Sequence, residues 1–164
     1  GLGGGNATDD MISNNIRASD TWAFFQAKNM RQTLYEVAAE GIQAEIAAAG
    51  APTAAQAARL AEYQATIARY EDEPDAEAPN DPLRGEGKRQ LRARAESFEA
   101  ARERAEAQDA NFDFAEVLLQ LALVLGSVAI LALNRPILWL AAGLGLAGSM
   151  LIANGFLLLV PLPL

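Results

Sequence analysis

The sequence predicts an all-α membrane protein: a long-helix soluble bundle over residues 8–114, then a C-terminal two-helix transmembrane hairpin over 115–160. All 21 acidic residues of the 164-residue chain lie at or before Glu116, and Arg135 is the only Lys or Arg beyond it. Two apolar stretches, 115–133 and 137–160, each have about the 20 residues that cross a bilayer, and their only charged residue is Glu116 at the water edge of the first. Before them, apolar residues recur at spacings of three, four and seven, which is typical of helices.

The segment 8–49 is expected to form one long helix. Its apolar stripe contains many small residues, so a neighbouring helix is expected to approach closely: Ile12, Ile16, Ala23, Ala27, Met30, Leu34, Val37 and Gly41. Residues 1–7 begin with a glycine-rich run rather than Met, and are expected to be a linker from something upstream.

Gly50 and Pro52 separate this helix from a second one, expected over 53–73, because Gly suits a helix end and Pro the first turn of a new helix. A third helix is expected over 88–114, where Leu91, Phe98 and Ala105 lie seven apart among Arg, Glu and Gln residues. This charged, amphipathic pattern is of coiled-coil type. Nothing interrupts it before the first apolar stretch, so the helix is expected to continue into the membrane.

Residues 74–86 are expected to be a loop, because they are rich in Pro, Gly and acidic side chains. The acidic residues in and before this loop suggest two alternatives, a divalent-cation site or a solvated charged loop: Glu71, Asp72, Glu73, Asp75, Glu77 and Asp81. They do not follow the spacing of a calcium-binding loop. We therefore favour the solvated loop and predict no metal site.

Composition also restricts the function. The chain has no Cys and no His, which removes Ser-His and Cys-His nucleophile pairs and the usual zinc and haem ligands. Its formal charge of −8 argues against binding to nucleic acid. No paired catalytic constellation is visible, so we expect a protein that is not an enzyme, with no catalytic residue and no cofactor.

Small residues four apart predict close packing of the two membrane helices. Gly126 follows Ala122 at this spacing, as do Ala141, Gly145 and Ser149 among themselves. Two partners are open: the hairpin closing on itself, which we favour, or another membrane protein.

Polar residues in the apolar stretches are costly unless they face protein. Gln120 and Asn154 lie inside the spans, and Glu116 precedes Gln120 by one turn. A structural role is favoured for these three over the lining of a transport path, because one carboxylate at a membrane edge is not a relay.

Trp22, Phe25 and Gln26 share a helical face beside the small-residue stripe. Such a group is either a recognition patch, since Trp anchors dominate many interfaces, or core packing between helices. Core packing against the 88–114 helix is favoured.

Two segments resemble the family DUF4337, a bacterial domain of unknown function. One runs from Ser19 to Arg31 (SDTWAFFQAKNMR) and the other from Phe112 to Gln120 (FDFAEVLLQ). The resemblance implies a further transmembrane helix upstream, a bacterial inner-membrane location and, with an anchor starting in the cytoplasm, a periplasmic soluble domain. It implies no activity and no site residue.

The expected function is therefore a non-enzymatic membrane scaffold or accessory subunit. Its expected partners are the lipid bilayer and either itself, as a homo-oligomer, or a larger membrane complex; a small subunit of a photosynthetic or respiratory complex would have this organisation. The alternative is a small transport or channel component, with Glu116, Gln120 and Asn154 lining a polar path.

Overall fold

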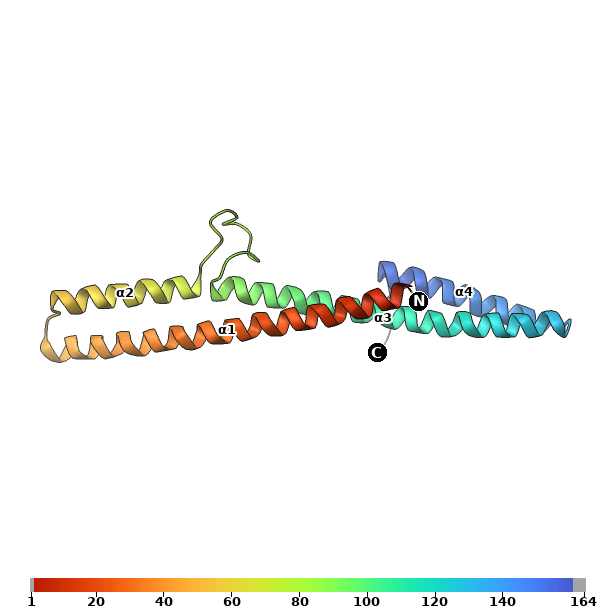
Figure 1. The fold of residues 1–164 in the computed structure, drawn as a ribbon, viewed down its shortest axis with the longest axis horizontal. Helices are drawn as coiled ribbons and strands as arrows, with labels where there is room; N and C mark the ends of the chain where they lie inside the picture. The colour runs from red at the N-terminus through yellow and green to blue at the C-terminus, as the bar shows by residue number, and fades with distance from the viewer. Residues whose placement is uncertain (1, 161–164) are drawn as a thin grey trace. The chain divides into compact units, whose positions relative to one another are not determined.

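The computed structural model describes residues 2–160, and its fold is all-helical, as predicted. Four helices follow one another in the chain: α1 (Leu2–Ala49), α2 (Ala54–Glu71), α3 (Lys88–Leu131) and α4 (Arg135–Leu157) (Figure 1). They form two compact units. The arm unit comprises Ile16–Glu99, and the hairpin unit comprises Gly1–Asn15 with Ala100–Leu164.

In the arm unit, α1 packs through a face that the apolar stripe did not indicate. The residues of this contact face lie seven apart and are all buried or half-buried: Ala18, Phe25, Gln32, Ala39 and Ile46. The expected stripe lies on the opposite side of α1 and is exposed along its whole length. Within the described residues no helix covers this stripe, so the close approach of a neighbouring helix to it stays a prediction.

Helix α2 runs beside the second half of α1 (Figure 1). It begins at a capping box, in which the Thr53 side chain accepts from Gln56 N and the Gln56 side chain accepts from Thr53 N. The Tyr35 ring of α1 contacts the rings of Tyr63 and Tyr70, with centroids 5.4 and 5.9 Å apart. No residue of α2 is buried, so α1 and α2 form a two-helix layer without an enclosed core.

The arm unit is not the three-helix bundle that the sequence suggested. Helix α2 contacts α1 from Lys28 onward, whereas the first turns of α3 contact the segment of α1 from Trp22 to Asn29. The contact face of α1 is long enough to take the two shorter segments in succession. Because α2 has only 18 residues, it does not reach the part of α1 that α3 covers.

Hydrogen bonds within the arm unit fix both ends of the loop that follows α2. Glu86 N donates to Glu73 O at 2.9 Å, and the Arg94 guanidinium donates to Leu83 O and Gly85 O at 2.9 and 2.8 Å. Gly85 has φ +113°, and a Cβ there would lie 2.3 Å from Glu73 O. Only glycine fits this position, since both the backbone conformation and the space exclude a side chain.

In the hairpin unit, α3 and α4 lie side by side (Figure 1). Helix α3 continues through residues 114 and 115 without a break, as predicted. The turn after it has Leu133 at φ +51°, and the Asn134 side chain caps α4 by accepting from Ile137 N at 3.4 Å. Pro136 lies in the first turn of α4, where its missing N–H costs nothing.

Residues 2–7 are helical and begin α1, whereas the expectation that residues 1–7 link the chain to an upstream segment stays a prediction. Tertiary contacts offset the low helix propensity of glycine here. The Thr8 hydroxyl lies 3.0 Å from both Gly4 O and Asp109 Oδ1, and Ala7 is 4% exposed. Residue 1 lies outside the described residues.

Candidate functional site

Small residues close the hairpin on itself. A Cβ at Gly126 would lie 3.9 Å from the Cβ of Ala141, and a Cβ at Gly145 would lie 3.7 Å from the Cβ of Ala122. Four of the five small residues predicted to pack on the spans therefore contribute to the α3–α4 contact. Ser149 does not, because it is exposed and its hydroxyl donates to Gly145 O of its own helix at 2.8 Å.

Two glycines that the spacing did not single out make the closest contacts. A Cβ at Gly148 would lie 2.9 Å from Leu119 Cγ, and a Cβ at Gly155 would lie 2.8 Å from Phe112 Cε1. Both glycines are buried. The Gly148–Gly155 spacing of seven residues is the signal that could have found them, since a heptad keeps both on one face.

Two asparagines join α3 to α4. The Asn154 amide donates to Asn111 Oδ1 at 2.7 Å, and Asn111 donates to Ala107 O at 2.7 Å. Asn154 also caps the end of α4, because its Oδ1 accepts from Val160 N at 2.9 Å and its Nδ2 donates to Val160 O at 2.8 Å. Beside this pair the rings of Phe112 and Phe156 meet edge-on at 5.1 Å. Asn111 is 1% exposed and was not predicted as a site residue.

The three polar residues proposed for a transport path fall into two groups. Gln120 Nε2 donates to Glu116 Oε1 at 3.0 Å, and both residues are exposed on α3. Asn154 instead belongs to the asparagine pair with Asn111. The structural role expected for Asn154 is thus the one that its hydrogen bonds support.

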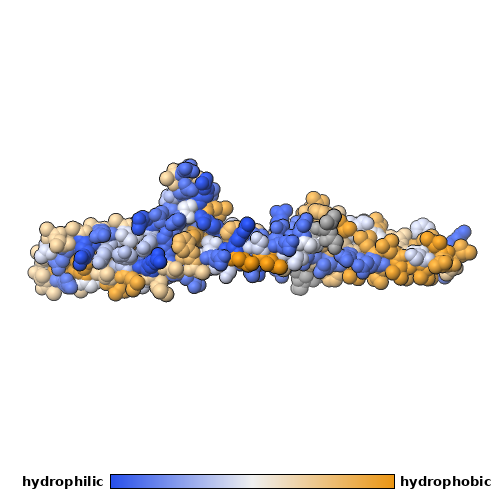
Figure 2. All heavy atoms as spheres, in the orientation of Figure 1, coloured by the Kyte–Doolittle hydropathy of each residue, from blue (hydrophilic) through white to orange (hydrophobic). Residues whose placement is uncertain are grey.

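The remaining surface of the hairpin is apolar. Helices α3 and α4 are both long and apolar enough to cross a membrane. Only 11% of the most apolar 18-residue segment of each helix is buried. Figure 2 shows hydrophobic residues gathered along α3 and α4 toward the turn that joins them. Among the exposed large side chains are Leu123, Ile130, Leu131, Leu133 and Trp139, which are 70–90% exposed. Soluble monomers rarely expose a contiguous apolar surface of this kind.

Trp22 and Phe25 pack against α3, as the sequence suggested. Trp22 Nε1 donates to Glu99 Oε1 at 2.7 Å, and the Trp22 and Phe25 rings meet edge-on at 5.4 Å. Lys88 Nζ lies 5.9 Å from the centroid of Phe25. Gln26 is exposed and takes no part in this contact, which corrects its assignment to the cluster.

A polar cluster lies where α1 meets the ends of α2 and α3. Lys28 is 6% exposed, and its Nζ donates to Glu73 Oε2 at 2.9 Å and to Glu86 O. The same ammonium lies 5.5 Å from the centroid of the Tyr70 ring. An ammonium bound by a carboxylate, a carbonyl and an aromatic face is held in place as a charge, so this lysine joins the elements. Helical periodicity alone gives no signal for such a buried lysine.

Other acidic residues at the base of the loop also have cationic partners. Lys88 Nζ lies 3.1 Å from Glu71 Oε2, Arg89 lies 2.9 Å from Asp72, and Arg84 lies 3.1 Å from Asp75. The hydrogen bond from Lys88 lowers the pKa of Glu71 below its ordinary value of 4.5, with a smaller contribution from Gln32, while partial burial opposes the shift. Ion pairs thus account for much of this acidic cluster.

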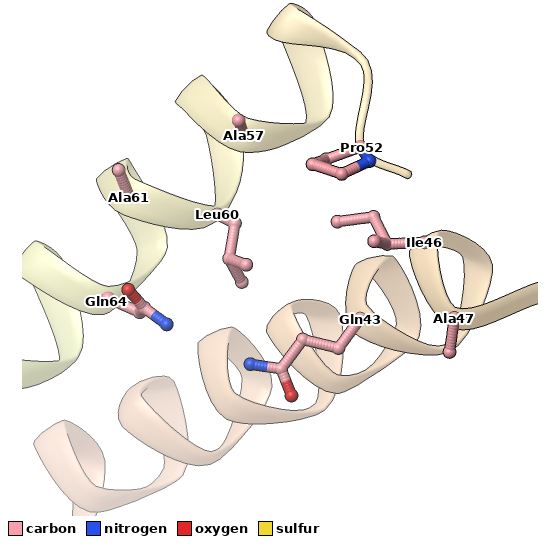
Figure 3. A pocket seen from close by; sticks show the side chains of 8 residues that line it. All are labelled: Gln43, Ile46, Ala47, Pro52, Ala57, Leu60, Ala61 and Gln64. Atoms are coloured by element: carbon pink, nitrogen blue, oxygen red, sulfur yellow. The ribbon is translucent and has the colours of Figure 1, made fainter. Parts of the chain in front are cut away.

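Two open grooves lie between α1 and α2. One, of about 400 Å³, lies next to the interhelical turn, and Figure 3 shows Ile46, Leu60 and Pro52 around it, with the amides of Gln43 and Gln64 at one end. The other, of about 470 Å³, is lined by Arg31, Leu34, Tyr35, Ala38, Tyr63 and Tyr70. The first contains only aliphatic and amide side chains, so it offers packing surface rather than a charged ligand site.

The fold and these surfaces define a class: an all-helical protein with two helices able to span a membrane and an acidic helical arm unit. Within that class the chain belongs to the family of the domain of unknown function DUF4337, whose profile matches residues 1–158. The family resemblance noted from the two segments is thereby confirmed. No curated protein and no solved structure gives a significant match to the chain.

Proposed function

We propose that this chain is a non-enzymatic membrane scaffold or accessory subunit, anchored by α3 and α4. The observation that carries the proposal is the exposed apolar surface of the hairpin unit, with 11% of each apolar window buried. A lipid environment removes the cost of exposing such side chains to water. The polar groups of α4 support the same environment, since Ser149 and Asn154 are hydrogen-bonded within the unit.

The arm unit supports the scaffold part of the proposal. Its described polar clusters consist of ion pairs and hydrogen bonds that join helices, such as Lys28 with Glu73 and Trp22 with Glu99. The side of α1 that stays exposed in the arm unit carries large apolar side chains such as Met30, Leu34 and Val37. A surface of this kind suits association with protein more than chemistry on a small substrate.

The proposed location is the bacterial inner membrane, with the arm unit in the periplasm. Arg135 is the first residue of α4, directly after the turn that follows α3, and is exposed, so it can reach lipid headgroups. The orientation is tested by labelling single cysteines at Arg135 and at Leu83 with a membrane-impermeant reagent in intact cells. Labelling at Leu83 alone supports the periplasmic arm, and labelling at Arg135 alone contradicts it.

The decisive experiment is purification of the full chain from its own membranes in a mild detergent, after a wash in alkaline carbonate. Retention in the washed membranes supports the anchor, and release into the wash contradicts it. Co-purification with a larger complex at fixed stoichiometry supports an accessory subunit. A particle of several copies of this chain alone supports a self-assembling scaffold, and an isolated single copy contradicts both.

A small transport component is the second candidate. The observation that favours it is the Gln120–Glu116 hydrogen bond of 3.0 Å on the exposed surface of α3. Ion flux in liposomes that falls in the Glu116→Gln and Gln120→Leu variants would support this role. Flux that is absent from the unmodified chain, or unchanged in both variants, would remove these residues from it.

A further inference from the structure

Polar residues limit the apolar surface of the hairpin at both of its ends. The far end is the turn between α3 and α4, where Asn134 and Arg135 follow soon after Leu131, the last residue of α3. At the near end, Glu116 and Gln120 are exposed on α3 and are joined by a hydrogen bond of 3.0 Å. Between these two limits, the exposed large side chains of α3 are all apolar.

The polar side chains at both ends lean away from the middle of the hairpin. A side chain on a helix leans toward the N-terminus of that helix. The N-terminus of α3 lies toward the near end, so Gln120 reaches back to Glu116, one turn closer to that end. The N-terminus of α4 is at the turn, so Arg135 leans outward there. Between the limits, Ser127 needs no water because its hydroxyl donates to Leu123 O at 2.8 Å.

The distance between the two limits is short for a pair of membrane-spanning helices. From Glu116 to Leu131, α3 advances by about 15 residues, or about 23 Å. A Cβ at Gly148 of α4 would lie 3.2 Å from Ala115 O, so Gly148 is near the level of Glu116. From there to Arg135, α4 covers about 13 residues, or about 20 Å. The hydrocarbon layer of a typical bilayer is about 30 Å thick, and any tilt of the hairpin shortens its reach further.

The apolar end of α4 does not lengthen this span. Phe156 and Leu157 are both 62% exposed and lie beyond the near limit. At their level α3 carries charge, because Asn154 is bonded to Asn111, and the exposed Asp113 lies two residues further along α3. A carboxylate costs far more in hydrocarbon than an apolar side chain costs among lipid headgroups. The charged helix therefore sets the limit for both.

A tryptophan marks the far boundary. Trp139 lies one turn after Arg135 on α4, and it is 77% exposed. Tryptophan is enriched at the level of the lipid headgroups, where its amphipathic ring meets both water and hydrocarbon. The boundary therefore falls within the first turns of α4, which agrees with the short distance between the two limits.

We propose that the hairpin binds the lipids of a thin bilayer, with a hydrocarbon layer of about 23 Å and acyl chains of about 14 carbons. This inference rests on the proposed membrane anchor and names the lipid that fits it. In a bilayer of about 30 Å, either Glu116 and Gln120 enter the hydrocarbon or the lipids around the hairpin compress. Short acyl chains avoid both costs.

The test is a competition between lipids for the surface around Trp139, in vesicles that contain the full chain. The Trp22→Phe variant is used, since it leaves Trp139 as the single tryptophan. A brominated phosphatidylcholine quenches the fluorescence of this residue. Short, medium and long phosphatidylcholines, with acyl chains of about 14, 18 and 22 carbons, compete with it. The relative binding constant is expected to be several-fold higher for the short lipid than for the long one. Equal constants, or a maximum at the medium or long lipid, would overturn the thin bilayer.

A double variant tests which residues set the near limit. Glu116→Leu with Gln120→Leu moves this limit to Asp113, about 5 Å further along α3, so the preference should shift from the short to the medium lipid. The matched control is Val124→Leu, at a 62% exposed position between the limits, which should keep the preference for the short lipid. An unshifted preference in the double variant would overturn the limit at Glu116 and Gln120, and with it the proposed thickness.

Failure of this inference and failure of the proposed anchor give different results. If the brominated lipid quenches Trp139 but the medium or long lipid binds best, the anchor stands and the thin bilayer fails. If the brominated lipid does not quench Trp139 at all, the hairpin lies outside the bilayer and both proposals fail.

Discussion

Trp22 of α1 and Glu99 of α3 are joined by a 2.7 Å hydrogen bond between Nε1 and Oε1, although 77 positions separate them in the chain. The indole also meets the Phe25 ring edge-on, so its apolar body and its polar N–H are both used. This contact sets the register between two helices whose heptad-like patterns would tolerate a shift along one another.

Trp22→Phe should lower the free energy of unfolding of the arm unit by about 1–2 kcal/mol, because Glu99 loses its donor while an aromatic ring remains. Urea unfolding followed by circular dichroism measures this change. Gln26→Ala is the control, and as an exposed residue it should change stability by less than about 0.5 kcal/mol. Equal stabilities of the two variants would show that the hydrogen bond does not matter.

Lys28→Met should cost more, about 3 kcal/mol, because it leaves the Glu73 carboxylate and the Glu86 carbonyl without their shared donor. Breaking a buried ion pair costs about 3–5 kcal/mol, and the lower end of this range applies because the Glu73 side chain is 35% exposed. Limited proteolysis within residues 74–86 should accelerate in this variant. Arg59→Met, on an exposed position of α2, should leave the cleavage rate unchanged.

The hairpin contact predicts a disulfide. In the double variant Ala122→Cys with Gly145→Cys, oxidation should join α3 to α4 within one chain, because their Cβ atoms would lie 3.7 Å apart. Mobility on a non-reducing gel reports the bond. Ala122→Cys with Gly143→Cys is the control pair, since a Cβ at Gly143 meets nothing within 4 Å. A bond of equal yield in both pairs would contradict the observed packing.

Adding Gly148→Leu to the first cysteine pair should lower the disulfide yield several-fold. A Cβ at Gly148 would already lie 3.2 Å from the backbone oxygen of Ala115, and backbone cannot turn aside as a side chain does. Gly143→Leu should leave the yield unchanged, because that position is open. The yield is read from the same gel, and an undiminished yield with Gly148→Leu would mean that α4 packs by another face.

Glu71 predicts a loss of arm stability in acid. Its pKa lies below the ordinary 4.5 because Lys88 donates to it, so its carboxylate binds fewer protons in the folded than in the unfolded state. The stabilisation that ionised Glu71 contributes is fully present above pH 4.5, and it is lost as the pH falls through the lowered pKa of Glu71. In Glu71→Gln the thermal midpoint should fall less steeply below this pH. An unchanged slope would assign the acid sensitivity to other carboxylates.

Much of the fold could be predicted from local sequence. The caps at Thr53 and Asn134, the turn at Gly50 and the apolar stretches each act within one or two turns of helix, so the helices fall close to their expected positions. The candidate site was only partly predictable. The spacing of four found Ala141 and Gly145, and the heptad spacing of Gly148 and Gly155 was a further signal, but Asn111 emerges only when α4 lies against α3.

The sequence by itself determined that the chain is helical, that α3 and α4 are apolar enough to span a membrane, and that every acidic residue lies at or before Glu116. Only the tertiary structure decided which face of α1 is covered. Periodicity ranks the faces of a helix by apolar content, and it therefore favoured the apolar stripe that includes Leu34. Packing instead buried the face with Lys28 and Gln32, because Glu73 and Glu71 from elsewhere in the chain supply hydrogen-bond partners for these polar groups.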